Sequence, residues 1–178
     1  GAAPDGYTLF MATYGAMSAV PSLHKAMHYD PVKDFAPIGK IGDAILILVA
    51  NNDFQGKTLS DVITISKKDS NGLSYGTSGA GGTPHIAGEL FKQKTGANLV
   101  HVPYKGAGQA ITDLIGGQVQ FFFSSASAIM NHIKGGKVKA LAVTSAERSP
   151  FNPELAPMAE LVAGYSSEIW WGVLAPAN

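Results

Sequence analysis

The part of the sequence best suited to chemistry is a glycine- and hydroxyl-rich run at residues 76–84, Gly-Thr-Ser-Gly-Ala-Gly-Gly-Thr-Pro. It falls between a predicted strand and a predicted helix, where free backbone N–H groups and the helix dipole favour an anion. The hydroxyls of Ser78 and Thr83, with the N–H groups around Gly79 and Ala80, would form a cradle for a carboxylate. The alternative is a tight loop whose glycines serve turn geometry alone.

Two better-known motifs come near this run, and neither is complete. A dinucleotide-binding fingerprint would need glycine at Pro84 and an acidic residue near residues 100–104, where there is none. A nucleophile elbow centred on Ser78 would need glycine at Ala80. The run therefore predicts an anion cradle, and no cofactor is expected.

Two other predicted strands end in polar residues. Ser124 and Ser125 follow the strand at 119–123, and Lys105 follows the strand at 98–102. Because the carboxyl ends of parallel strands meet at one edge of a sheet, these residues are expected to share a crevice with Ser78. For the serines the alternative is helix capping, and for Lys105 it is plain solvation, which we favour.

The histidines raise the question of a metal, and the pattern argues against one. His24 and His28 stand four residues apart, but no third ligand is near and the chain has no cysteine. Exposed histidines are the expected reading, and no metal site is predicted. His85, in the first turn of the helix after the glycines, is expected to fix that loop by hydrogen bonding and not to act as a general base.

Composition narrows the function classes. Thirteen basic and 13 acidic residues cancel, and no basic patch predicts binding to nucleic acid. The longest apolar run, residues 44–50, is too short to span a bilayer. Absence of cysteine excludes disulfides without fixing the compartment.

The elements that would position these residues alternate between strand and helix. Thr58 and Asp61 predict a capping box for a helix to about residue 68. Strands and helices then alternate to residue 144, which predicts an α/β fold with a mainly parallel sheet and helices on both faces. Upstream, residues 7–12 predict a short buried strand, 13–19 a small-residue loop and 38–49 a long strand buried on both faces. A last extended run is predicted at 168–174.

This organisation predicts two lobes. Residues 45–164 form one nearly complete lobe, residues 1–44 are part of the other lobe and a first hinge crossing, and residues 165–178 cross back. The chain opens in the middle of a turn motif, so further sequence is expected before Gly1.

Several stretches, in order and spacing, resemble one family over essentially the whole chain. It is the family of tripartite tricarboxylate transporter substrate-binding proteins, the Bug receptors. The resemblance is carried by Ala-Pro-Asp-Gly-Tyr-Thr-Leu at 3–9, Tyr-Asp-Pro-Val-Lys-Asp-Phe-Ala-Pro at 29–37, and the stretches at 87–91, 100–106, 112–120, 140–144 and 171–177.

The resemblance implies a type II periplasmic-binding-protein fold: two Rossmann-like lobes with a hinge, one lobe incomplete in this chain. It further implies a monomeric periplasmic receptor without catalytic activity. Its ligand would be a small organic carboxylate, such as a dicarboxylate, tricarboxylate or aromatic acid, delivered to membrane permease subunits. The resemblance also implies a signal peptide and the first two strand-to-helix loops of lobe one before Gly1, and a further segment after Asn178.

The resemblance also assigns ligand-binding residues. Thr13 and Tyr14 would belong to a loop of lobe one, and the lobe-two side would contribute Ser78, Gly79, Ala80, Thr83, Ser124 and Ser125. Many relatives carry an acidic residue at the position of Ser124. Its absence here puts amino-acid ligands in doubt.

Two alternatives belong to other classes. The effector-sensing half of a transcription regulator shares the two-lobed architecture and predicts a helix-turn-helix upstream. A serine hydrolase would use Ser78 with His85 or His101, and requires a Ser–His hydrogen bond.

Overall fold

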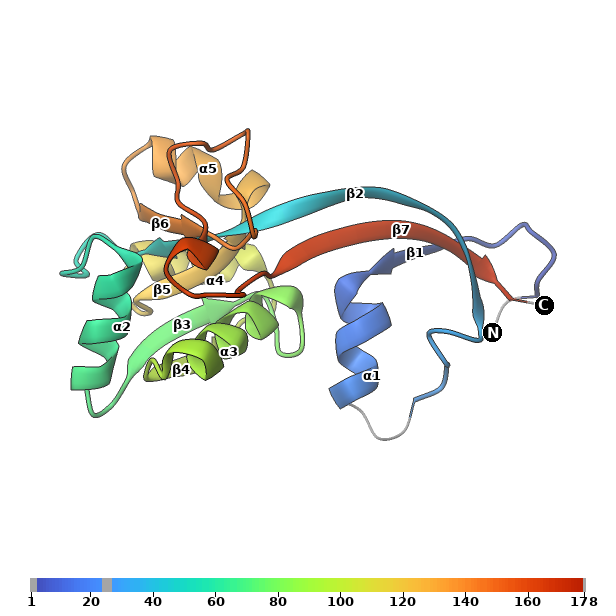
Figure 1. Cartoon of the computed structure of the whole chain (residues 1–178), viewed down its shortest axis with the longest axis horizontal. Helices are drawn as coiled ribbons and strands as arrows, with labels where there is room; N and C mark the ends of the chain where they lie inside the picture. Colours follow the sequence, from blue (N-terminus) through green and yellow to red (C-terminus); the bar gives the residue numbers. More distant parts are fainter. Residues whose placement is uncertain (1–2, 24–26, 178) are drawn as a thin grey trace. The chain divides into compact units, whose positions relative to one another are not determined.

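The computed structural model describes residues 3–23 and 27–177, and the chain divides into two compact units. Unit 1 comprises Gly1–Ala44 and Ile169–Asn178, and unit 2 comprises Ile45–Glu168. Two long strands, β2 (Phe35–Ala50) and β7 (Glu168–Pro176), have residues in both units (Figure 1). Whether the units act as hinged lobes stays a prediction. His24, one of the paired histidines, lies outside the described residues.

Unit 1 is built on the antiparallel pairing of β1 (Phe10–Thr13) with β7, in which Phe10 lies opposite Leu174 and Thr13 opposite Trp171. The predicted strand at 7–12 is thus shifted toward the C-terminus, and its predicted burial is wrong, because only Ala12 of β1 is buried. Tyr7 is 92% exposed and forms no part of the strand.

The small-residue loop predicted at 13–19 is also wrong. Residues Gly15–Ala19 form one turn of π-helix, which continues into α1 (Val20–Leu23). The Thr13 hydroxyl accepts a hydrogen bond from the Ala16 N–H at 3.3 Å, which ties the end of β1 to the start of this turn. Alanine, methionine and serine resist helix formation little, but they lack the apolar period that reveals a helix in a sequence.

The sheet of unit 2 contains the end of β2 together with β3 (Leu73–Thr77), β4 (Leu99–Pro103), β5 (Phe121–Ser125) and β6 (Lys139–Val143). Strand β3 is parallel to β4 and to β5, which confirms the predicted parallel alternation. Strand β2 pairs antiparallel with both β5 and β6. Only its last five residues, 46–50, are fully buried, so burial on both faces was predicted correctly for this end alone.

Helices follow the strands in unit 2, and their starts reflect local sequence signals. The predicted capping box is confirmed: the Thr58 hydroxyl accepts from the Asp61 N–H at 3.2 Å, and the Asp61 carboxylate accepts from the Thr58 N–H at 2.9 Å. Glycines stand at the ends of three helices, as the sequence predicted. The elements are α2 (Leu59–Lys68), α3 (Thr83–Thr95), α4 (Ala107–Ile115), α5 (Ala126–Lys134) and a 3₁₀ turn at Met158–Glu160.

Strand β5 carries the core on both of its faces. Phe122 packs with residues of α4 and α5, including Leu114 and Ile129. Phe121 and Phe123 point to the opposite face, because side chains alternate along a strand; there the Phe123 ring meets Tyr75 edge-on at 5.9 Å. Helices therefore cover both faces of this sheet, as predicted (Figure 1). Each buried phenylalanine contributes about 2 kcal/mol of apolar burial.

Within residues 3–23 and 27–177, none of the helices has the length and apolar character needed to cross a membrane.

Candidate functional site

The carboxyl ends of three parallel strands meet at one edge of the unit 2 sheet. Gly76 of β3 lies level with Val102 of β4 and with Phe122 of β5. The segments that leave these strands therefore start at the same edge, as the sequence predicted for Ser78, for Lys105 and for Ser124 with Ser125. The Lys105 side chain is exposed, in agreement with plain solvation.

The glycine loop between β3 and α3 has a backbone that other residues would strain. Gly79 has φ +145° and Gly81 has φ +77°, both in the range that favours glycine. Helix α3 begins at Thr83 after Gly82, which has no side chain to cap it. Among the residues that the structure describes, none accepts a hydrogen bond from the N–H groups of Ala80, Gly82 or Thr83. These donors are therefore free for an anion.

The side chains of the loop differ in exposure. Ser78 is exposed, and Thr83, the first residue of α3, is only 7% exposed. Ser78 can therefore offer its hydroxyl to solvent or to a ligand. The Thr83 side chain is nearly buried, so its N–H group is the more accessible donor to a ligand.

A buried threonine fixes the start of the loop. The Thr77 side chain is 0% exposed, and its hydroxyl donates to the Gly79 carbonyl at 3.0 Å and accepts from the Gly79 N–H at 3.3 Å. The same oxygen lies 2.7 Å from Nε2 of His101. With its proton given to Gly79, this oxygen is an acceptor toward His101, so His101 donates through Nε2.

A histidine fixes the other end of the loop, which confirms the role predicted for His85. The Gly81 N–H donates to Nδ1 of His85 at 3.1 Å, so Nδ1 is unprotonated and the ring proton is on Nε2. Nε2 lies 4.0 Å from Oε1 of Glu89. The rings of His85 and His101 are stacked, with centroids 4.0 Å apart and planes at 19°.

A set of polar groups on β3 and α3 supports this histidine pair. Glu89 accepts hydrogen bonds from the Tyr75 hydroxyl at 2.6 Å and from the Lys92 ammonium at 2.9 Å. Burial raises the pKa of Glu89, but the bonds from Tyr75 and Lys92 outweigh it and hold the pKa below its usual value. Burial, and next the neighbouring His85, lower the pKa of His101, so His101 favours its neutral form.

The two serines at the end of β5 are in different environments. Ser124 is 1% exposed, and its hydroxyl donates to the Ser125 carbonyl at 3.3 Å. Ser125 precedes α5, but its side chain makes no capping hydrogen bond, so the capping alternative is not supported for it. Its hydroxyl lies 3.3 Å from that of Ser127. Ser125 is thus the more accessible donor, and ligand binding by either serine stays a prediction.

The two candidates in unit 1 stand side by side in the sequence. Thr13 ends β1, and its hydroxyl accepts from the Ala16 N–H; Tyr14 is the N-cap residue of the π-helical turn. Both side chains are half-buried. Their roles in ligand binding stay predictions.

The hydrolase alternative required a hydrogen bond from Ser78 to a histidine. His85 uses Nδ1 for Gly81, and His101 uses Nε2 for the buried Thr77. In the described part of the chain, Ser78 makes no hydrogen bond to either ring. The same described part contains no group of three residues that could hold a metal ion.

Sequence reasoning identified the glycine loop but missed most of the polar network beside it. A signal was present: Tyr75 and Thr77 are two residues apart on one strand, so they share a face, and His85 and Glu89 are four apart on one helix. The missing step was the register, because only the pairing of Tyr75 with His101 brings the elements together.

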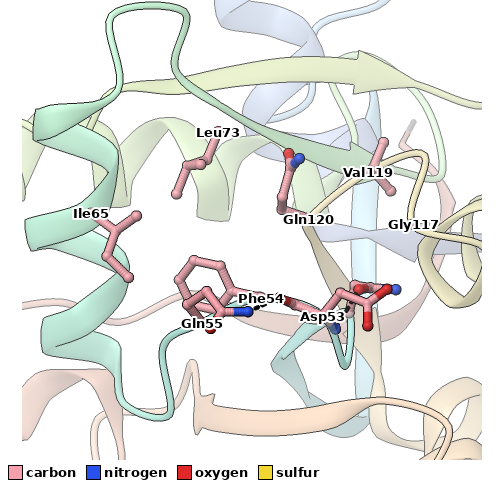
Figure 2. Close-up of a pocket in the computed structure, with 9 residues that line it drawn as sticks. Asp53, Phe54, Gln55, Ile65, Leu73, Gly117, Val119 and Gln120 are labelled. Atoms are coloured by element: carbon pink, nitrogen blue, oxygen red, sulfur yellow. Dashed lines mark hydrogen bonds between the residues drawn. The ribbon is translucent and has the colours of Figure 1, made fainter.

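A hollow of about 250 Å³ lies at the opposite edge of the same sheet, where β3 and β5 begin. Figure 2 shows the side chains of Phe54, Ile65 and Leu73 around it. Part of its polar lining is already engaged, since Oε1 of Gln120 accepts from the Ser74 N–H at 2.7 Å and from the Ser74 hydroxyl at 2.6 Å.

Comparisons with known proteins give the family. The whole chain, residues 1–178, matches the tripartite tricarboxylate transporter family receptor. Protein BugT of Bordetella pertussis is 35% identical over 178 residues, which cover 98% of this chain and 54% of BugT. The chain thus spans about half the length of the curated relatives it matches.

Solved structures agree with this. The periplasmic binding protein BugD is 35% identical, with a TM-score of 0.86 over 99% of this chain and 59% of that one. A Rhodopseudomonas palustris protein with adipate is 33% identical, with a TM-score of 0.88 over 98% of this chain and 59% of that one. MatC from Rhodopseudomonas palustris, with bound malate, is 28% identical, with a TM-score of 0.84 over 99% of this chain and 60% of that one.

These likenesses confirm the predicted fold class, an α/β periplasmic-binding-protein fold of which this chain spans about 59%. They also agree with the prediction of binding without catalysis, since the matching family is one of receptors. The chain belongs to the family of tripartite tricarboxylate transporter receptors.

Proposed function

We propose that this chain is the ligand-capturing part of a periplasmic receptor for a small organic carboxylate, which it delivers to membrane permease subunits. The observation that carries the proposal is the set of free N–H groups of Ala80, in the glycine loop, and of Gly82 and Thr83, at the start of α3. They point from a helix N-terminus, where the dipole favours negative charge. The exposed Ser78 hydroxyl adds a neutral donor beside them.

The neutral character of this set suits a reversible receptor. A carboxylate held by N–H groups and hydroxyls avoids the desolvation of an added buried cation, so the complex can dissociate again. Hydrogen bonds from neutral groups to a charged acceptor each contribute about 1.5–3 kcal/mol. Three or four of them sum to about 4.5–12 kcal/mol before the entropy of association, about 4 kcal/mol or more, is subtracted.

The solved relatives support the ligand class. One was solved with adipate and another with malate, and both molecules are dicarboxylates. The delivery step rests on the family description, which names a tripartite transporter. The periplasmic location is supported by BugD, described as a periplasmic binding protein. Roles for Thr13, Tyr14 and Ser125 in the same capture are part of the proposal.

Calorimetry tests the capture step. The protein, expressed from its complete reading frame, is titrated with adipate, malate, benzoate and aspartate, and hydrolysis or conversion of each is followed in parallel. We expect at least one carboxylate to bind without turnover and the S78A variant to bind it about tenfold more weakly, the loss of one charged hydrogen bond. S60A, on the exposed surface of α2, is the matched control. No binding across the panel, together with turnover of any member, refutes the receptor function.

A further inference from the structure

The side chains of Thr77 and His85 form hydrogen bonds to the two ends of the glycine loop. The bond to His85 would be lost if Nδ1 took up a proton. We propose that His85 is a positioning residue whose unprotonated Nδ1 fixes the anion-binding conformation of the loop, so that protonation of His85 releases the loop and weakens capture of the carboxylate. The ligand part of this inference rests on the proposed function. The loop part does not.

Two attachments define the conformation of the loop. Thr77 holds Gly79 through both its N–H and its carbonyl, and His85 holds Gly81 through its N–H. Between and after these points lie the free N–H groups of Ala80, Gly82 and Thr83. Glycine has wide conformational freedom, so a loop with Gly79, Gly81 and Gly82 needs such attachments to stay in one conformation.

The attachment at Gly81 depends on the protonation state of one nitrogen. Neutral imidazole has one N–H donor and one acceptor nitrogen, and here the acceptor is Nδ1, 3.1 Å from the Gly81 nitrogen. Imidazolium has two donors and no acceptor. Protonation of His85 would therefore set two N–H groups against each other at Gly81, and the loop must move to separate them.

The charged and titratable groups around His85 come from three elements. On α3 itself, Glu89 lies 4.0 Å from Nε2 and favours a charged ring, while Lys92, bonded to Glu89, opposes it. On β4, His101 is stacked on His85, and two charged rings with centroids 4.0 Å apart would repel each other. On β3, the Tyr75 hydroxyl stays neutral because burial and Glu89 raise its pKa.

Burial and His85 lower the pKa of His101, which favours its neutral ring, and in either charge state its Nε2–H donates to Thr77. Among the described residues, the side chain that accepts from the Gly81 N–H is that of His85, so a proton on Nδ1 of His85 would remove this bond.

Two substitutions of His85 test the hydrogen-bond acceptor and the aromatic ring separately. In H85N the side-chain oxygen stands where Nδ1 stood, so it accepts from Gly81 but does not titrate. In H85F the ring is kept for stacking on His101, but both nitrogens are lost. Neither change touches the free donors of the loop, and thermal unfolding of both variants controls for the fold.

The first measurement needs no ligand. Protection of the Gly81 amide against hydrogen exchange is followed by NMR from about pH 8 to 5.5, the range in which histidine titrates. In the wild type we expect protection to fall as the pH falls, in H85N to stay constant, and in H85F to be low throughout. Protection in H85F equal to that of the wild type at about pH 8, or a pH dependence that persists in H85N, overturns the proposal.

The second measurement is the Kd of adipate and of malate over the same pH range. We expect binding by the wild type to weaken about fivefold toward acid pH, as for the loss of one neutral hydrogen bond, and binding by H85N to stay level. Tighter wild-type binding at acid pH would mean that attraction to the charged ring dominates, and it overturns the proposal. If neither acid binds, the proposed ligand class fails, and the Gly81 amide alone decides the role of His85.

Discussion

Gly88, in the middle of α3, lies so close to β3 that it has no room for a side chain. A Cβ added to Gly88 would lie 2.6 Å from Cζ and 2.9 Å from the hydroxyl oxygen of Tyr75, well inside van der Waals contact. The Tyr75 ring is fully buried between α3, Phe123 and His101, so it has little freedom to move away. We therefore predict that the G88A variant is destabilised.

The size of the effect follows from two opposing contributions. Replacing glycine by alanine inside a helix stabilises the helix by about 1 kcal/mol. Overpacking a tight core site destabilises by about 1–3 kcal/mol, and moving the Tyr75 hydroxyl away from Glu89 weakens a charged hydrogen bond of about 1.5–3 kcal/mol. We expect a net loss of about 2 kcal/mol, which lowers the Tm by about 4–8 °C for a protein of this size.

The assay is thermal and urea unfolding of G88A beside a matched variant, G108A. Gly108 also lies in a helix, α4, but a Cβ there meets nothing within 4 Å, so G108A should be as stable as the wild type or more so. A double-mutant cycle with Y75L adds a second check, because the smaller leucine makes room and the penalty of G88A should largely disappear. If G88A is as stable as G108A, or if Y75L leaves the penalty unchanged, the steric argument is refuted.

Three further predictions concern stability. T58A should lose about 1 kcal/mol, because Thr58 caps α2 through its hydroxyl, and urea unfolding would measure it. N51A should lose about 2 kcal/mol of unfolding free energy, because the buried Asn51 amide donates to the Leu114 carbonyl at 2.8 Å and nothing replaces this donor. An N51D variant as stable as the wild type would contradict this, because aspartate cannot donate the bond. Burial raises the pKa of Tyr165, whose hydroxyl donates to the Ala87 carbonyl at 2.9 Å. A raised pKa means that this stabilisation is complete below the unfolded pKa of 10.0 and is lost as the pH rises beyond it. The free energy of unfolding, measured with urea at a series of alkaline pH values, should therefore fall less steeply with pH in Y165F than in the wild type.

Local signals predicted most of unit 2. The Thr58 capping box and the alternation of strands with helices depend on residues close together in the sequence, and both appear where predicted. The position of Ser78 and Ser125 at the same edge of the sheet was predicted from the rule that the carboxyl ends of parallel strands meet at one edge. His85 was correctly expected to fix the glycine loop, because it stands one helical turn from the glycines.

The rest depended on pairing between distant residues. The stack of His85 on His101 requires the register in which Tyr75 lies opposite His101, and no local pattern specifies it. Antiparallel insertion of β2 between β5 and β6 was not predicted, since a strand buried on both faces looks the same in either direction. The helical turn at Gly15–Ala19 was missed because its small residues carry no apolar period.

The three consecutive phenylalanines of β5 have a consequence for the chain before it folds. They lie in a stretch from Leu114 to Met130 without a single charged residue, and such stretches of high β-propensity associate with one another when exposed. In the native sheet β5 is covered on both edges, by β2 and by β3. One of these covering strands comes from much earlier in the chain, so protection of the segment waits for a distant pairing and is completed late. Yield on refolding should therefore fall as protein concentration rises, with aggregation beginning at the phenylalanines that later form the centre of the core.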